Sequence, residues 1–158
     1  MVWKAVFFSL LLLTARFAYA LALDKAAFYA AMTSGDITDI DKELAVLTDN
    51  EQGYTGALLI RKAGMVPKVK DKLKLFKQGR IKLETALQND PENTEFHFLR
   101  LSIQEHAPGI VRYKANLDAD KAFLIKHFNE LPLIVQRAVK DYCKNSKTLK
   151  PTDFNTDH

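Results

Sequence analysis

Apolar residues recur at three- and four-residue spacing along most of the chain, and strict alternation of apolar and polar residues is rare. This period places apolar side chains on one face of a helix. Glycine and proline residues separate the periodic segments and mark the turns between them. The pattern predicts an all-α protein of about seven helices, arranged as consecutive antiparallel hairpins and covering residues 24–34, 36–47, 51–63, 69–89, 92–105, 117–129 and 131–146.

The longest predicted helix, 69–89, carries an apolar stripe that we expect to be buried against the other helices. A glycine inside a helix costs about 1 kcal/mol relative to alanine. Gly79 lies within the stripe and therefore indicates that a neighbouring helix approaches closely at this position. The stripe consists of Val69, Leu73, Phe76, Gly79, Leu83, Ala86 and Leu87.

Two short polar segments give the clearest helix boundaries. Asp36 is a good N-cap for the second helix. Asp90 is a capping residue followed by Pro91 at the first helical position of the fifth helix. This fifth helix is apolar on more than one face, so we expect it in the middle of the domain. Residues 147–158 are polar, and we expect them to form a flexible C-terminal tail.

The first 20 residues have the three parts of a secretory signal peptide. Lys4 supplies a positive charge, residues 5–14 form an uncharged apolar run, and Ala18 and Ala20 are the small residues of a cleavage site. Cleavage after Ala22 is the alternative. Arg16 interrupts the apolar stretch, which is shorter than the about 20 residues that a membrane anchor needs. We therefore expect an exported protein, periplasmic or secreted, with no stable transmembrane span after cleavage.

Size and charge are compatible with one domain, residues 21–146, between the signal peptide and the tail. The chain has 23 basic and 19 acidic side chains, and two of the basic ones leave with the signal peptide, so the mature net charge is about +2. Cys143 is the only cysteine and cannot form an internal disulfide. Its position in a predicted helix favours a small buried hydrophobic residue over a reactive thiol or a link between two chains.

The segment 77–100 resembles the junction between two tetratricopeptide-type helical hairpins. The resemblance rests on Gly79 as a small packing position, Ala86 seven residues later, and Pro91 after a short acidic turn. It implies stacked antiparallel helix pairs that bind peptides or proteins in a concave groove. The chain lacks the roughly 34-residue period of that family. The mature chain also resembles short exported bacterial helical proteins that have no known activity.

Basic residues are concentrated between Arg61 and Lys82, where nine occur with Asp71 as the one acid. Such a segment can bind anionic lipid headgroups or other polyanionic surfaces. The alternative is a solvated helix face that the acidic segment 36–51 balances. The candidate anionic-surface ridge consists of Lys68, Lys70, Lys74, Lys77 and Arg80.

Polar residues also gather on the fifth helix and the loop after it, where they predict a candidate polar pocket. Arg100 lies inside an apolar helix and therefore needs a carboxylate or carbonyl partner. The alternative to a pocket is a buried ion pair that fixes the packing of the helices. The candidate pocket residues are His97, Arg100, Gln104, Glu105, Arg112 and Tyr113, with His106 nearby.

No pattern in the chain indicates catalytic, metal or cofactor chemistry. The four histidines form no i, i+4 pair, and no phosphate-binding glycine loop or nucleophile elbow occurs. The sequence therefore favours a non-enzymatic exported protein without cofactor, one that mediates protein–protein interaction in the cell envelope. An anionic envelope surface is the alternative partner, and a hydrolase with an unrecognised site is the alternative activity. Export argues against a nucleic-acid partner.

Overall fold

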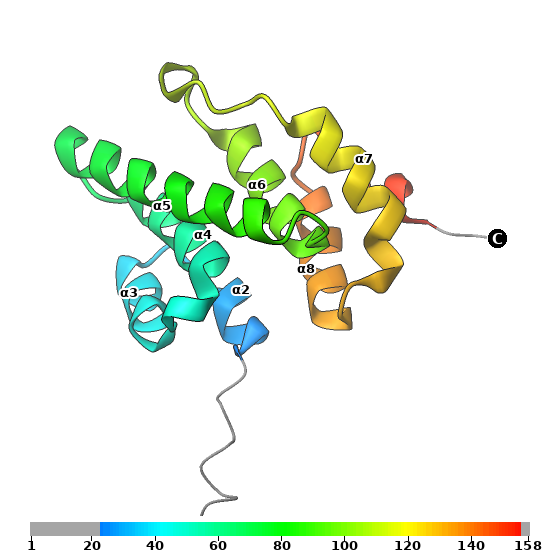
Figure 1. The fold of residues 1–158 in the computed structure, drawn as a ribbon, viewed down its shortest axis with the longest axis horizontal. Coiled ribbons are helices and arrows are strands. Elements are labelled where there is room, and N and C mark those ends of the chain that lie inside the picture. Colours follow the sequence, from blue (N-terminus) through cyan, green and yellow to red (C-terminus); the bar gives the residue numbers. More distant parts are fainter. Residues whose placement is uncertain (1–22, 156–158) are drawn as a thin grey trace, which may run out of the picture.

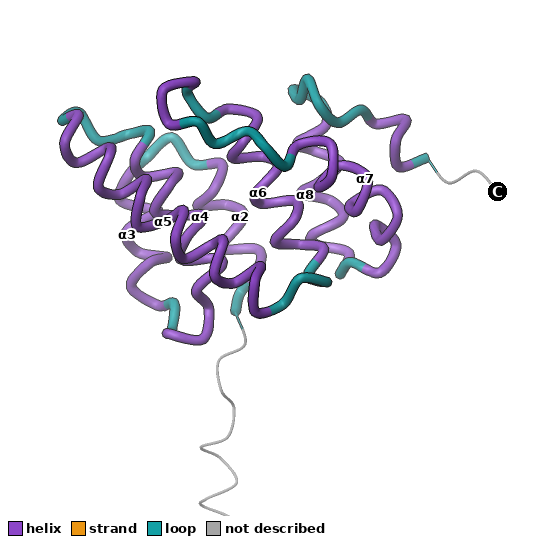
Figure 2. Tube along the Cα trace, turned by 45° about the horizontal axis from the view of Figure 1, so that its top comes forward, coloured by secondary structure: helices purple, strands orange, loops and turns teal. Residues whose placement is uncertain are grey.

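The computed structural model describes residues 23–155, so the predicted signal peptide lies outside the described residues (Figure 1). Between residues 23 and 155 there are helices and loops but no strand, and the all-α prediction is confirmed (Figure 2). The α-helices are α2 (Lys25–Thr33), α3 (Ile37–Val46), α4 (Gln52–Ala63), α5 (Val69–Asn89), α6 (Thr94–His106), α7 (Leu117–His127) and α8 (Leu133–Cys143). Short 3₁₀ helices are η1 (Asp49–Glu51), η2 (Gly109–Val111), η3 (Phe128–Glu130) and η4 (Pro151–Phe154). Within this part of the chain, no helix has the length and apolar content needed to cross a membrane.

Aspartate side chains cap the first two helices. Asp24 accepts hydrogen bonds from the backbone nitrogens of Ala26 and Ala27 at 2.9 and 3.1 Å. Asp36 accepts one from the backbone nitrogen of Thr38 at 2.8 Å, which confirms its predicted role. These bonds satisfy amide groups that have no partner within the helix, so they fix where α2 and α3 begin.

The start of α6 differs from the prediction. Asn93 is the N-cap, and its side-chain oxygen accepts a hydrogen bond from the backbone nitrogen of Phe96 at 3.1 Å. Asp90 and Pro91 lie in the turn before it, so placing Pro91 at the first helical position was wrong. The asparagine oxygen reaches the free amide of the first turn, and the helix therefore begins at Thr94.

Helix α6 lies in the middle of the domain, as the sequence predicts. It contacts α4, α5, α7 and α8. Its side chains Phe98, Leu99 and Leu101 are buried within a core to which most of the helices contribute. A helix with neighbours on several sides needs apolar residues on more than one face, and this explains its broad apolar surface.

Helices α4 and α5 pack against each other through glycine. A Cβ atom on Gly79 would lie 2.5 Å from the carbonyl oxygen of Gly56, and one on Gly56 would lie 2.6 Å from that of Gly79. Both distances are far below van der Waals contact, so only glycine permits the observed separation of the two backbones. The close approach predicted at Gly79 is therefore present.

The first half of α5 is exposed, although the sequence predicts burial along the whole stripe. Leu83 and Leu87 are buried, but Val69 and Leu73 are 71% and 54% exposed. The prediction was wrong for these two residues because the outer end of α5 extends beyond the helices that cover its second half (Figure 1).

The core extends further along the chain than residue 146. Leu149 is fully buried and Phe154 is 5% exposed, and the ring of Phe154 lies 4.5 Å from that of Phe128. Lys121 of α7 forms an ion pair with Asp153 of η4 at 3.1 Å. The segment predicted to form a flexible tail therefore contributes side chains to the core as far as Phe154.

Candidate functional site

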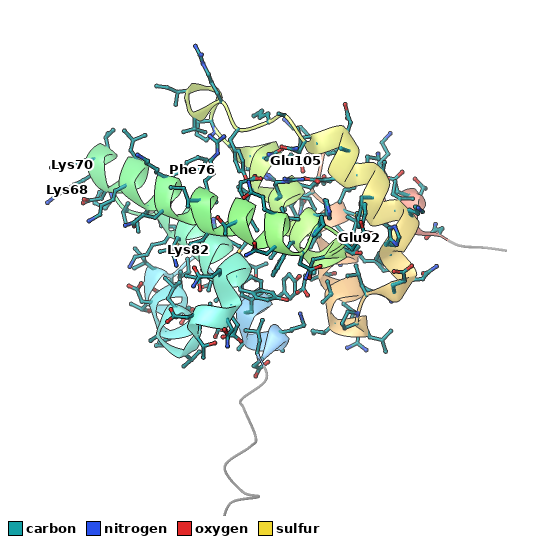
Figure 3. The ribbon with its side chains drawn as sticks, in the orientation of Figure 1. Lys68, Lys70, Phe76, Lys82, Glu92 and Glu105 are labelled. Carbon is teal, nitrogen blue, oxygen red and sulfur yellow. The ribbon has the colours of Figure 1, made fainter. Side chains whose placement is uncertain are left out.

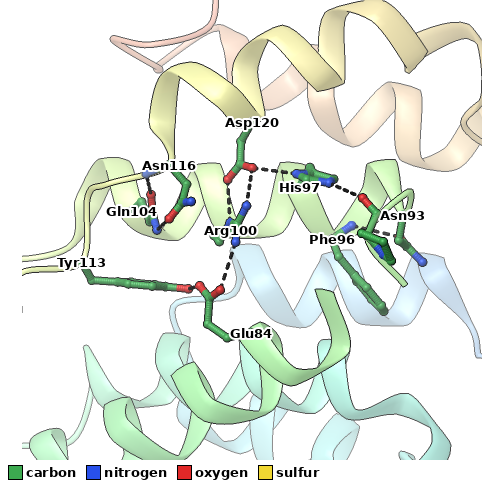
Figure 4. Close-up of polar contacts among 10 residues, drawn as sticks. Glu84, Asn93, Phe96, His97, Arg100, Gln104, Tyr113, Asn116 and Asp120 are labelled. Carbon is green, nitrogen blue, oxygen red and sulfur yellow. Dashed lines mark hydrogen bonds and ion pairs between the residues drawn. The ribbon is translucent and has the colours of Figure 1, made fainter. Parts of the chain in front are cut away.

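Arg100 of α6 joins three helices through hydrogen bonds (Figure 4). Its Nε and Nη2 donate to the two carboxylate oxygens of Asp120 of α7 at 2.8 and 2.7 Å. Its Nη1 donates to Glu84 of α5 at 3.0 Å. The side chains of Arg100 and Asp120 are 11% and 1% exposed, so this is a buried ion pair with bidentate geometry.

His97 and Tyr113 extend the same network at its two sides. His97 Nδ1 lies 2.7 Å from Asp120, and His97 Nε2 lies 2.8 Å from the carbonyl oxygen of Pro91. The Tyr113 hydroxyl donates to Glu84. Three of the predicted pocket residues therefore meet, but they meet through the two carboxylates, which the sequence analysis did not assign.

The network stabilises its own charges. Burial raises the pKa of Asp120, but hydrogen bonds from Arg100 and His97 outweigh burial and hold that pKa below its usual range. Burial lowers the pKa of His97, yet its bonds to Asp120 and to the Pro91 carbonyl outweigh this effect and raise it. The Asp120 carboxylate is therefore stabilised in its ionised form by the side chains that it contacts, and it is not a free acid or base.

The remaining predicted pocket residues make no side-chain hydrogen bond to this network. Gln104 exchanges two hydrogen bonds with Asn116, at 3.1 and 3.0 Å, and so fixes the start of α7. Glu105 accepts hydrogen bonds from the segment that follows α8, including Ser146 at 2.7 Å. Arg112 is exposed in a left-handed backbone conformation with φ of 46°. The six residues do not form one pocket, and their contacts fit the alternative of structural ion pairs and hydrogen bonds.

An open apolar groove is a functional candidate that the sequence did not indicate. It has a volume of about 930 Å³ and is lined by residues of α2, α4, α5, α6, η2 and α8. Its lining includes Met32, Leu73, Phe76, Ile103 and Val111, and none of the six predicted pocket residues. Its volume is at the upper end of the range of about 300–1,000 Å³ that is typical of ligand sites. The one sequence signal was the stripe on α5, which was assigned to the core.

Charged side chains stand on opposite walls of this groove. Arg61 and Lys72 line it on the side of α4 and α5, and Asp141 lines it on the side of α8. Arg61 Nη2 donates to the carbonyl oxygen of Ser34 at 2.9 Å, but its Nε is buried and has no hydrogen-bond partner within residues 23–155. A groove with one basic wall and an apolar floor is suited to an amphipathic partner.

The predicted ridge follows the exposed side of α5. Lys68, Lys70, Lys74 and Lys77 are exposed, and Arg80 lies 4.6 Å above the ring of Tyr113. Figure 3 shows Lys68 and Lys70 at the outer end of α5, where their side chains point away from the other helices.

The flanks of the basic segment are partly balanced, as the alternative interpretation expects. Lys62 of α4 forms an ion pair with Asp41 of α3. Lys82 of α5 donates a hydrogen bond to the side chain of Gln52 of α4. Asp41 of α3 therefore pairs with one lysine at the start of the segment, while the outer turns of α5 keep their excess positive charge.

Cys143 is a buried hydrophobic residue, as predicted. Its exposed fraction is 3%, and it lies in the core cluster. Burial raises the pKa of its thiol to about 11. A thiol of this kind is protonated at neutral pH and is a poor nucleophile.

Neither a group of metal ligands nor similarity to a known protein indicates a function. Among residues 23–155, no three histidine, cysteine, aspartate or glutamate side chains are grouped so that they could hold a metal ion. Comparisons of the chain with protein-family models, with curated proteins and with solved structures found no match.

Proposed function

We propose that this is an exported, non-enzymatic helical protein of the cell envelope that binds a partner protein through the groove between α2, α5, α6 and α8. The observation that carries the proposal is the open apolar groove of about 930 Å³. Contiguous apolar surface that a folded chain leaves open is typical of interaction sites. The occupant that fits best is an amphipathic helix of the partner, because such grooves bind the apolar face of a helix.

The arrangement of the helices supports a binding function of this kind. The proposal includes packing as consecutive antiparallel hairpins, in the manner of tetratricopeptide proteins, and the glycine contact between α4 and α5 supports it. Paired helices of that type build concave surfaces with rigid walls. A rigid wall favours affinity, since little conformational entropy is lost when the partner binds.

The polar side chains in the groove do not favour an enzyme. Ser102 and His106 both line it, but Ser102 Oγ donates to the carbonyl oxygen of Leu99 at 2.9 Å. His106 Nδ1 lies 3.0 Å from the carbonyl oxygen of Ser102. No hydrogen bond connects the Ser102 hydroxyl to His106 in the described structure. A serine nucleophile requires an adjacent base, so this pair does not support the alternative of a hydrolase.

Site-specific photo-crosslinking in cells that export the protein tests the proposal. A photoreactive residue replaces Ala30 or Ala138, which both line the groove, or Ala45 or Ala122, which do not. We expect the two groove positions to give the same cross-linked partner and the two control positions to give none. Cross-links of equal yield at all four positions would contradict a groove-specific interaction.

A blocked groove provides the second measurement. Ala30→Trp places a large side chain at the groove wall from an exposed position, so the fold is retained. Ala122→Trp is the matched control on the exposed side of α7. We expect the first variant to lose the cross-link from Ala138 and the second to keep it. If both variants keep it, the partner does not occupy the groove.

A further inference from the structure

The outer end of α5 and the nearby 3₁₀ helix η2 together expose an unusual set of apolar side chains. Val69 and Leu73 of α5 are 71% and 54% exposed, and Ile110 of η2 is 87% exposed. All three line the mouth of the same groove. Isolated exposed apolar residues are common on proteins, but three that share one rim form a patch that indicates an interaction surface.

Lysines flank this patch on both sides of α5. Val69 and Leu73 are four residues apart and lie on one face of the helix. Lys72 and Lys70 lie on opposite flanks of that face, and Asp71 lies on the far side of the helix. An apolar stripe between two rows of lysines is the pattern of a helix that lies in a membrane interface.

The charges of this end of α5 have no partners in the described structure. None of the four outer lysines forms an ion pair with another described residue, in contrast to Lys62 nearby. Every residue from 67 to 74 is exposed. The side chains are therefore free to contact phosphate groups without first breaking an internal contact. The four lysines are Lys68, Lys70, Lys72 and Lys74.

We propose that this surface, residues 68–74 of α5 with Ile110 of η2, docks on the surface of a bilayer that contains anionic lipids. We name it the docking rim. Val69, Leu73 and Ile110 enter the interfacial layer, and the lysines contact the headgroup phosphates. The inference goes beyond the proposed protein partner, because a bilayer binds the rim and does not need to occupy the groove.

The apolar side chains distinguish a bilayer from a soluble polyanion. A soluble polyanion would bind the lysines alone and would gain nothing from Leu73 or Ile110. A bilayer uses both parts of the rim, since headgroup attraction brings the helix to the surface and apolar burial holds it there. Changes to the lysines and changes to the apolar residues should therefore have separate effects on vesicle binding.

Flotation with lipid vesicles tests the proposal. The protein used is the one purified from cells that express and export the full chain. We would compare phosphatidylcholine vesicles with vesicles that also contain phosphatidylglycerol, over a series of salt concentrations. We expect binding to the anionic vesicles only, and we expect it to weaken steeply as salt rises. Equal binding to both kinds of vesicle, or no binding to either, would overturn the proposal.

Matched variants assign the binding to the rim. All variants carry the same N-terminus as the wild type, so any effect of residues 1–22 on vesicle binding is the same in each comparison. Each lysine near an anionic surface changes the partition coefficient roughly fivefold, so changing the four rim lysines to glutamine should abolish binding. The control variant changes four exposed lysines elsewhere and should bind almost as the wild type does. The control residues are Lys42, Lys126, Lys147 and Lys150.

A second variant tests the apolar part. We expect Leu73→Ser combined with Ile110→Ser to weaken vesicle binding at least tenfold while the dependence on salt stays the same. These positions are exposed, so circular dichroism should show an unchanged fold. If this variant binds as well as the wild type, and inorganic polyphosphate competes fully, the rim binds polyanions by charge alone and the bilayer proposal is wrong. If the lysine variant and its control lose binding equally, the rim has no special role.

Discussion

Replacement of Gly79 by alanine tests the packing of α4 against α5, because two known effects act in opposite directions. Alanine has a higher helix propensity than glycine by about 1 kcal/mol, which would stabilise α5. The new Cβ atom would lie 2.5 Å from the carbonyl oxygen of Gly56 and 3.0 Å from the backbone nitrogen of Ile60. Backbone atoms cannot rotate away as a flexible side chain can, so the helices must move apart.

The magnitude follows from the same geometry. Inserting atoms into a well-packed interior costs about 1–3 kcal/mol, and a contact with backbone on two sides belongs near the top of that range. After the gain in helix propensity is subtracted, we expect Gly79→Ala to lower the free energy of unfolding by about 1–2 kcal/mol. For a domain of this size, that corresponds to a decrease in Tm of roughly 4–8 °C.

Gly35 provides the matched control. No atom lies within 4 Å of a Cβ placed on Gly35, and its backbone is not in the left-handed region. Gly35→Ala should therefore leave stability unchanged or raise it by about 0.4–1 kcal/mol. Urea unfolding followed by circular dichroism measures both variants. If Gly79→Ala proves as stable as Gly35→Ala, or more stable than the wild type, the close contact between α4 and α5 at Gly79 is not present.

Four further predictions concern buried groups. Asp120→Asn should lower the free energy of unfolding by about 3 kcal/mol, because it leaves the buried guanidinium of Arg100 with one carboxylate partner. Urea titration measures this loss, and a loss below about 1 kcal/mol would contradict a buried ion pair. Because the pKa of His97 is raised in the folded state, the stability that its protonation adds is complete below the unfolded pKa of about 6.5 and is lost as pH rises through the folded value. The free energy of unfolding should therefore fall as pH rises above about 6.5, and His97→Gln should remove this slope. Cys143, with its buried thiol of pKa about 11, should react with a thiol reagent at pH near 8 only after denaturation, and rapid reaction of the native protein would disprove its burial. Leu149→Ala should lower the free energy of unfolding, measured in urea, by about 2–5 kcal/mol, and the control Thr152→Ala at an exposed position should lower it by less than about 0.5 kcal/mol. Equal small effects of the two changes would show that the C-terminal segment does not stabilise the core.

Local signals predicted the helices well because the forces that start and end a helix act over a few residues. The bounds of α5 agree with the sequence pattern at both ends, and Asp36 caps α3 as expected. The error at the start of α6 also has a local cause. Both Asp90 and Asn93 can cap a helix, and only the backbone geometry of the turn decides that Asn93 does so.

The candidate site could be predicted only in part. The sequence indicated that Arg100 needs a carboxylate partner, and it has two. It could not indicate that Asp120 and Glu84 are these partners, since they are 20 and 16 residues away along the chain and lie on other helices. Nor could it separate Glu105 from His97, although both lie on α6, because the two side chains face different neighbours.

The sequence by itself determined the helical class, the central place of α6 and the glycine contact of α5, because periodicity and propensity are properties of short segments. Only the tertiary structure decided which apolar faces are covered. Val69 and Leu83 belong to one stripe in the sequence, yet one is exposed and the other is buried. Whether a face becomes core or an open groove depends on which helices pack against it, and that packing is a property of the whole chain.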